Sequence, residues 1–154
     1  MYQGRNYAVA TTAALASSST LPLLTIIGTA AVRSMIYEFE FGSSGTPADS
    51  AASFTIQRCT TAGTPGSSFT PVAIDPGDPA AVSTCGLATF SAGPTLTSNA
   101  YLYNFGINQR ATFRWIAAPG SELKIPATAS NGLAFMPLNV STTWTPQFTV
   151  LIAE

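Results

Sequence analysis

The sequence predicts an all-β protein built as an antiparallel β-sandwich. Apolar and polar residues alternate with period 2 over several short segments, as expected for strands with one buried face. The 12 glycines and 11 prolines among 154 residues interrupt these segments at short intervals. Helical periodicity is not sustained over any long stretch. This length fits a single domain with one core, and neither a repeat nor a linker divides it.

The clearest strand is 34-SMIYEFEFG-42, in which the alternation is easy to follow. We expect one face to carry Met35, Tyr37, Phe39 and Phe41, and the opposite face to carry Ile36, Glu38 and Glu40. The segment 52-ASFTIQRC-59 predicts a second strand with Phe54 and Ile56 inward. Loops rich in Gly, Pro and Ser flank it. Further strands are expected at 23–31, 84–90, 99–106, 110–117, 122–126, 132–137 and 145–152.

Residues 1–20 are rich in Ala, Thr and Ser and have no clear period. Two alternatives fit this composition: an extended arm that adds to a neighbouring subunit, or the first strand of the domain's own sheet. In the arm alternative, Tyr2, Arg5 and Tyr7 would make the contacts. We therefore divide the chain into an N-terminal arm with the first strands, 1–32, and a β-sandwich, 33–154, within one domain overall.

Charge is scarce in this chain, with six Lys and Arg against seven Asp and Glu and a net charge of −1. Electrostatic binding of nucleic acid needs clustered basic residues, so no nucleic-acid partner is predicted. The apolar run 21-LPLLTIIGTAAV-32 is far shorter than the ~20 residues that span a bilayer, so no membrane partner is predicted. A free surface with so little charge would be poorly soluble, and we expect much of it to be covered in the working state.

The residue types available exclude most catalytic chemistry. The chain has no histidine, which removes Ser-His-Asp and Cys-His systems and His-ligated metals. Cys59 and Cys85 are too few for a zinc site, and they are either buried free thiols or one bridge. Glu38 and Glu40 have a spacing that could serve a glycosidase, but a solvated or arginine-paired strand face is favoured. The prediction is therefore no enzyme, no cofactor and no metal.

The stretch 108-NQRATFRWIAAPGSELKIP-126 concentrates charge beside aromatic residues. In a strand over 110–117, Arg110 and Arg114 would point outward while Phe113 and Trp115 enter the core. Arginine suits planar pairing with carboxylates and carbonyls, which predicts a structural clasp. The clasp set is Arg110, Arg114, Glu38, Glu40 and Glu122. It holds either a neighbouring strand or a neighbouring subunit, and residue spacing leaves both alternatives open.

The segments 45-GTPADSAASFTIQRCTTAGT-64, 71-PVAIDPGDPAAVSTCG-86 and 107-INQRATFRWIAAPGSELKIPATASNGLAF-135 together resemble small structural proteins of tailed bacteriophages. In particular, they resemble capsid decoration, or cement, proteins with a jelly-roll-like β-sandwich. The resemblance covers roughly residues 33–154 and rests on the ordered set of segments rather than on one motif.

The resemblance implies a structural role in the virion. Such proteins bind the outside of an assembled capsid, often as trimers, and stabilise the shell. It implies a homotrimer whose partners are further copies of itself and a major capsid protein, placed on the capsid exterior after assembly in the host cytoplasm. A different class, a carbohydrate- or receptor-binding module of a tail, fibre or baseplate, is the alternative. It would use exposed aromatic residues, for which Tyr101, Tyr103 and Trp144 are the candidates.

Overall fold

The computed structural model describes residues 4–16, 19–87 and 89–154 and confirms an antiparallel β-sandwich. Its described part contains strands and loops but no helix. The strands are β1 (Asn6–Thr12), β2 (Leu24–Ile27), β3 (Met35–Ser43), β4 (Ala51–Cys59), β5 (Ser67–Phe69), β6 (Val72–Ala73), β7 (Thr84–Leu87), β8 (Leu96–Asn108), β9 (Phe113–Ile116), β10 (Leu123–Lys124), β11 (Gly132–Val140) and β12 (Pro146–Ala153).

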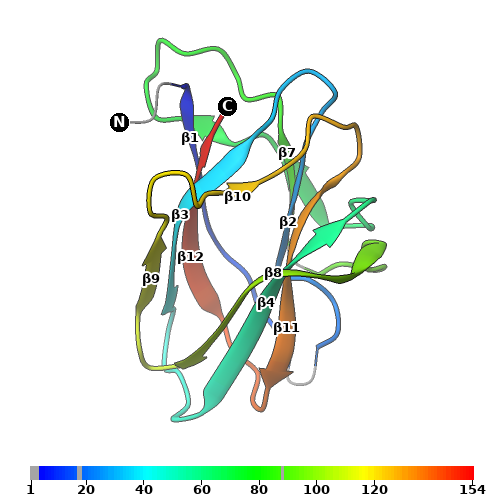
Figure 1. The fold of residues 1–154 in the computed structure, drawn as a ribbon. Coiled ribbons are helices and arrows are strands. Elements are labelled where there is room, and N and C mark those ends of the chain that lie inside the picture. The colour runs from blue at the N-terminus through cyan, green and yellow to red at the C-terminus, as the bar shows by residue number, and fades with distance from the viewer. Residues whose placement is uncertain (1–3, 17–18, 88) are drawn as a thin grey trace.

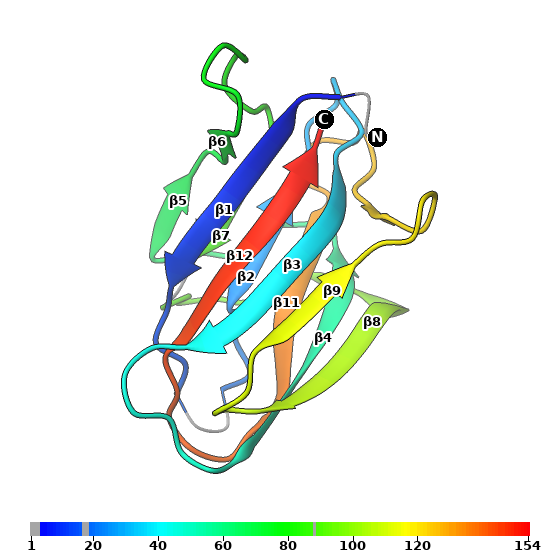
Figure 2. The same ribbon diagram turned by 90° about the vertical axis from the view of Figure 1, so that its left-hand side faces the viewer.

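Two sheets face each other, as Figures 1 and 2 show. The first has the order β10-β3-β12-β1-β6, with β9 also paired to β3, and the second has the order β5-β7-β2-β11-β4-β8. Many consecutive strands lie in opposite sheets, and four of these crossovers join β1 to β2, β3 to β4, β8 to β9 and β11 to β12. The strands joined by these crossovers are neighbours in the same order in both sheets. The first sheet has β1, β12, β3 and β9 in this order, and the second has β2, β11, β4 and β8. This is the rolled arrangement of a jelly roll. These four crossovers lie at one end, the crossover end, and the start of β1 and the end of β12 lie at the other (Figure 2).

Aromatic side chains fill the space between the sheets. Phe39, Phe41 and Phe54 are fully buried, and each touches other rings. Phe39 stacks on Trp115 with ring centroids 5.0 Å apart, and Phe105 stacks on Phe113 at 4.9 Å. Burying a side chain of this size stabilises the fold by about 1.5–3 kcal/mol. The inward placement predicted for Phe54 and Ile56 is confirmed.

The predicted faces of the strand over 34–42 are correct only in its second half. Phe39 and Phe41 are buried as predicted, but Ile36 is also buried while Tyr37 is partly exposed. The reason is a bulge, because Leu151 of β12 pairs with Glu38 and the next residue, Ile152, pairs with Ile36. An extra residue on one strand shifts the alternation by one and reverses the faces before it.

Residues 6–12 form a strand of the domain's own sheet, which is one of the two alternatives left open for the N-terminal segment. All seven residues of β1 pair with β12, and Tyr7 and Ala8 also pair with β6. The side chains of Tyr7 and Val9 are buried in the core. Because β2 lies inside the second sheet, both parts of the predicted division, 1–32 and 33–154, contribute to one sandwich.

The protein's own loops cover the centre of the second sheet's outer face. Ile27, Cys59, Ala134 and Met136 form a small apolar cluster there, with Ala62 and Leu96 packed against it. Hydrogen bonds join the two covering segments, from Thr60 N to Thr95 O and from Thr64 N to Ala92 O. Sequence patterning did not predict this cover, which makes the centre of this sheet buried on both sides.

The two cysteines are buried free thiols in the second sheet. Burial raises the pKa of the Cys59 thiol to about 11. Burial, with the Glu154 carboxylate as a smaller contribution, raises the pKa of the Cys85 thiol to about 12. Of the two alternatives, free thiols are therefore what the structure shows.

Candidate functional site

The outer face of the first sheet is uncovered, unlike the centre of the second, and we call it the open face (Figure 2). Strand pairing arranges its outward side chains in three rows that cross β1, β12, β3 and the β9 segment. The rows are Thr12-Gln147-Gly42-Thr112, Ala10-Thr149-Glu40-Arg114 and Ala8-Leu151-Glu38-Ile116. Ala, Gly and Thr occupy six of these twelve positions and charged residues occupy three, so the face offers several hydrogen-bonding groups.

An ion pair between Arg114 of β9 and Glu38 of β3 lies at one edge of the open face. The Nε and Nη2 atoms of Arg114 each lie 2.7 Å from Oε1 of Glu38. In the β3–β9 ladder Arg114 stands opposite Glu40, so the pair is diagonal and runs to the next row. The Glu38 side chain is 18% exposed and the Arg114 side chain 56% exposed. This pair joins two neighbouring strands of one chain. A neighbouring strand was one of the two alternatives for the clasp, and a neighbouring subunit was the other.

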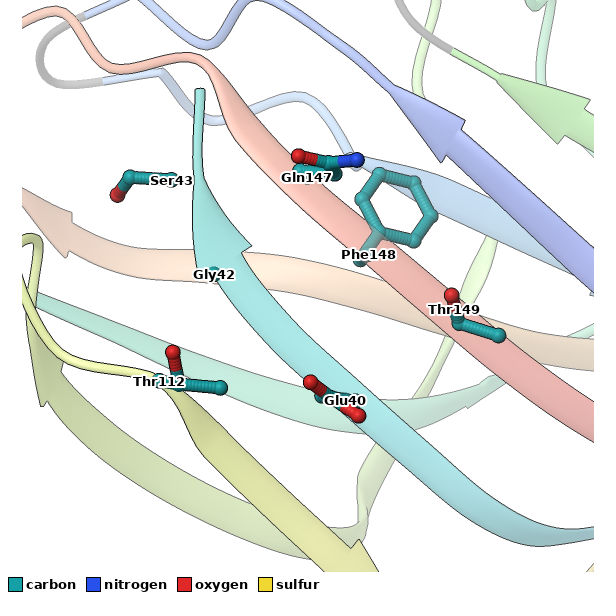
Figure 3. A pocket seen from close by; sticks show the side chains of 7 residues that line it. All are labelled: Glu40, Gly42, Ser43, Thr112, Gln147, Phe148 and Thr149. Atoms are coloured by element: carbon teal, nitrogen blue, oxygen red, sulfur yellow. The ribbon is translucent and has the colours of Figure 1, made fainter. Parts of the chain in front are cut away.

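A hollow of about 350 Å³ lies in the open face beside Glu40. Thr112, Glu40, Gln147 and Thr149 lie around the main chain of Gly42, as Figure 3 shows. A Cβ atom added at Gly42 would lie 3.8 Å from Thr112 Oγ1 and 4.0 Å from Gln147 O. These are ordinary contact distances, so the absent side chain leaves the hollow free to receive a group from outside. Sequence patterning did not predict this hollow, because a glycine at this position is typical of the end of a strand.

Arg110 does not share a strand face with Arg114, which corrects the strand predicted over 110–117. The strand is confined to residues 113–116, and Arg110 lies in the turn after β8. Its Nη1 lies 3.6 Å from Asp49 Oδ2, and its Nε donates to the carbonyl of Pro47 at 3.3 Å. Arg110 thus ties together two loops at the crossover end. Asp49 was missed because a loop residue carries no periodicity that would place it.

The remaining predicted contact residues lie apart from the open face's ion pair. Glu122 accepts a hydrogen bond from Gly120 N at 2.9 Å and shapes a turn. Arg5 exchanges main-chain hydrogen bonds with Glu154, and its Nε lies 4.0 Å from Asp78. Tyr7 is 1% exposed and donates its hydroxyl to Pro79 O at 3.1 Å. Arg5 and Tyr7 are therefore used within their own domain, and Tyr2 lies outside the described residues.

Two of the three aromatic candidates for carbohydrate binding belong to the interior. Trp144 is 2% exposed, and Tyr103 packs against the core and lies 5.9 Å from the Phe39 ring. Tyr101 alone of the three is well exposed, at 55%. A sugar-binding platform built from all three is therefore not formed.

No protein-family model, curated protein or solved structure matches this chain. Within the described residues, no helix is long and apolar enough to cross a bilayer. The same residues contain no group of three or more Cys, Asp or Glu side chains placed to hold a metal ion.

Proposed function

We propose that this protein is a virion structural protein that binds the outside of a bacteriophage capsid and stabilises the shell. The observation that supports it is the contrast between the centres of the two sheets: the protein's own loops cover the outer face of one, and the open face is bare. The open face leaves hydrogen-bonding side chains such as Thr12, Thr112 and Gln147 without a covering layer, so a partner protein can cover it. The resemblance to decoration proteins supplies the particular partner, a major capsid protein.

The chemistry of the open face supports attachment. Its single strong charge pair, Arg114 with Glu38, is already satisfied within the chain. Covering the face therefore requires little desolvation of unpaired charge beyond that of Glu40, a cost that otherwise opposes association. Thr12, Thr149 and Thr112 can donate and accept hydrogen bonds to a partner.

The proposal includes self-association as a homotrimer. A threefold ring uses two different patches of each chain, because its contacts run head to tail. In the trimer, one of these patches includes part of the open face. The remainder of the open face contacts the capsid protein or the neighbouring copy. The exposed side chains of Ile116 and Leu138, each 57% exposed, add apolar area available for burial.

A charged side chain placed in the open face tests the proposal. Ala10 is exposed in the middle row, so Ala10→Arg adds bulk and charge without disturbing the core. Binding is measured by cosedimentation with capsids stripped of this protein, and trimer formation by analytical ultracentrifugation. Wild type should bind the capsid shell, and Ala10→Arg should bind at least about tenfold more weakly.

Asn104→Arg is the matched control, because Asn104 is exposed on β8 of the other sheet. It should bind like wild type. Equal binding by Ala10→Arg and Asn104→Arg would show that the open face is not the attachment surface. Wild-type protein that binds purified tails but not capsids would overturn the capsid assignment in favour of the tail, fibre or baseplate alternative.

A further inference from the structure

Three basic side chains line a second hollow, which we call the cationic groove. Arg33, Arg58 and Lys124 surround an open volume of about 360 Å³, with Pro126 as the remaining lining residue. They come from the β2–β3 connection, from β4 and from β10, so strands of both sheets bring them together. The whole chain has six Lys and Arg, and half of them meet here.

The cationic groove differs from the other basic positions in how its charges are paired. Arg5, Arg110 and Arg114 each face a carboxylate, of Asp78, Asp49 and Glu38 respectively. In the described part of the chain, Arg33, Arg58 and Lys124 form no ion pair. Three like charges gathered without a counter-charge repel one another, and an anion placed among them removes that repulsion.

One of the three side chains is held in place by the main chain. Nη1 of Arg58 donates to the carbonyl oxygen of Lys124 at 3.0 Å. Arg58 is partly buried, whereas Arg33 and Lys124 are exposed. A guanidinium fixed through one of its donors keeps the rest of its planar edge available for a carboxylate. The groove therefore has one positioned cation and two exposed ones.

We propose that the cationic groove binds an acidic peptide segment of a partner protein through its carboxylates. Three cations around an open groove match several carboxylates spaced along an extended chain better than one small anion. Compact phosphate sites commonly use helix N-termini, and the described residues form none. Single-stranded nucleic acid is bound by aromatic stacking, and no aromatic side chain lines this groove.

This inference goes beyond the proposed function and does not depend on it. The cationic groove lies toward the end of β4 and beside β10, whereas the proposed attachment surface is the open face of β1, β12, β3 and β9. The two surfaces can therefore be tested separately, one with a peptide in solution and the other with capsids.

A peptide titration tests the cationic groove. The probe is a hexaglutamate peptide, titrated by isothermal calorimetry into the full-length protein, with inorganic phosphate and an oligothymidine of equal charge as separate arms. We expect the peptide to bind, and to bind more weakly as salt is raised from about 0.05 M to about 0.3 M. The double variant Arg58→Gln/Lys124→Gln should lose at least about tenfold in affinity.

The matched control is the double variant Arg5→Gln/Arg110→Gln, which removes the same two charges from side chains that are 60% and 61% exposed. It should bind the peptide within about twofold of wild type. Melting temperatures check that both variants are folded, and Arg33→Gln/Lys124→Gln replaces the first variant if loss of the Arg58 bond unfolds it. No peptide binding, equal loss in the control, or tighter binding of phosphate or oligothymidine than of peptide would overturn the proposal.

Discussion

The indole N–H of Trp144 donates a hydrogen bond of 2.6 Å to the hydroxyl of Ser43, 101 positions earlier in the chain. The Ser43 hydroxyl in turn donates to the main-chain oxygen of Gln109. The Gln109 side chain is fully buried and bonds Thr142 through both its amide nitrogen and its amide oxygen. Three of the four crossovers at the crossover end are thus joined by one partly buried polar network.

Removing the Gln109 side chain should destabilise this network. Gln109→Ala leaves Thr142 without its partner and opens a buried space, and we expect a loss of about 1–3 kcal/mol in the free energy of unfolding. Urea denaturation measures it. Gln147→Ala, at an exposed glutamine on β12, should change stability by less than about 0.5 kcal/mol. Equal effects of the two substitutions would contradict a structural role for the network.

The ion pair between Arg114 and Glu38 should contribute little to stability. Because the arginine side chain is more than half exposed, solvent screens the pair, and we expect a coupling energy of about 0.5–1 kcal/mol. A double-mutant cycle with Arg114→Gln and Glu38→Gln, followed by urea denaturation, measures this quantity. A coupling above about 2 kcal/mol would mean that the pair is shielded, as it would be if copies associate over the open face.

The buried thiols should make stability fall at high pH. The ordinary thiol pKa is 9.0, and in the folded protein it rises to about 11 for Cys59 and about 12 for Cys85. Their contribution is therefore complete below about pH 9 and is lost as pH rises through 9 toward 11 and 12. Each thiol should contribute up to about 1.4 kcal/mol per pH unit in that window.

The variant Cys59→Ala/Cys85→Ala isolates the thiol contribution. Its free energy of unfolding should decline less steeply than that of wild type above pH 9, although the variant is less stable at neutral pH because buried atoms are lost. Parallel slopes for the two proteins would show that the thiols ionise equally in the folded and unfolded states.

The strand β1 should be indispensable to the isolated domain. Val9 is fully buried opposite Val150, and Val9→Ala should cost roughly 2 kcal/mol, measured by thermal unfolding. Ala10→Ser, one position along and exposed, should cost less than about 0.5 kcal/mol. Deletion of residues 2–12 should prevent folding, and a truncated chain that keeps its melting temperature would show that β1 acts as an arm.

Strand positions with strong apolar alternation could be predicted from the sequence. Phe39, Phe41, Phe54 and Ile56 were placed correctly because each belongs to a segment with one fully buried face. The alternation of Phe113 and Trp115 with Arg114 was also correct. In contrast, the prediction for β1 left two alternatives open. Its outward residues Ala8 and Ala10 are small and apolar, so they do not alternate clearly in polarity with the inward residues Tyr7 and Val9.

The wrong predictions concern features that depend on contacts between segments far apart in the chain. The bulge after Ile36 arises from pairing with β12, which lies over a hundred positions away. Arg110 was assigned to a strand although it lies in a turn, because the residue types around it occur in both turns and edge strands. Its partner Asp49, and the meeting of Arg33 with Lys124, depend on how the loops are folded back on the sandwich.

The adjacent chain ends determine how the domain responds to mechanical force. Arg5 and Glu154 exchange main-chain hydrogen bonds, and from there β1 and β12 run side by side in opposite directions. Pulling on both ends peels these strands apart, so their bonds break one after another instead of sharing the load. A load applied at Arg5 and Glu154 would therefore act on one β1–β12 bond at a time. Strain carried across the sheet faces would instead act on the whole sandwich at once.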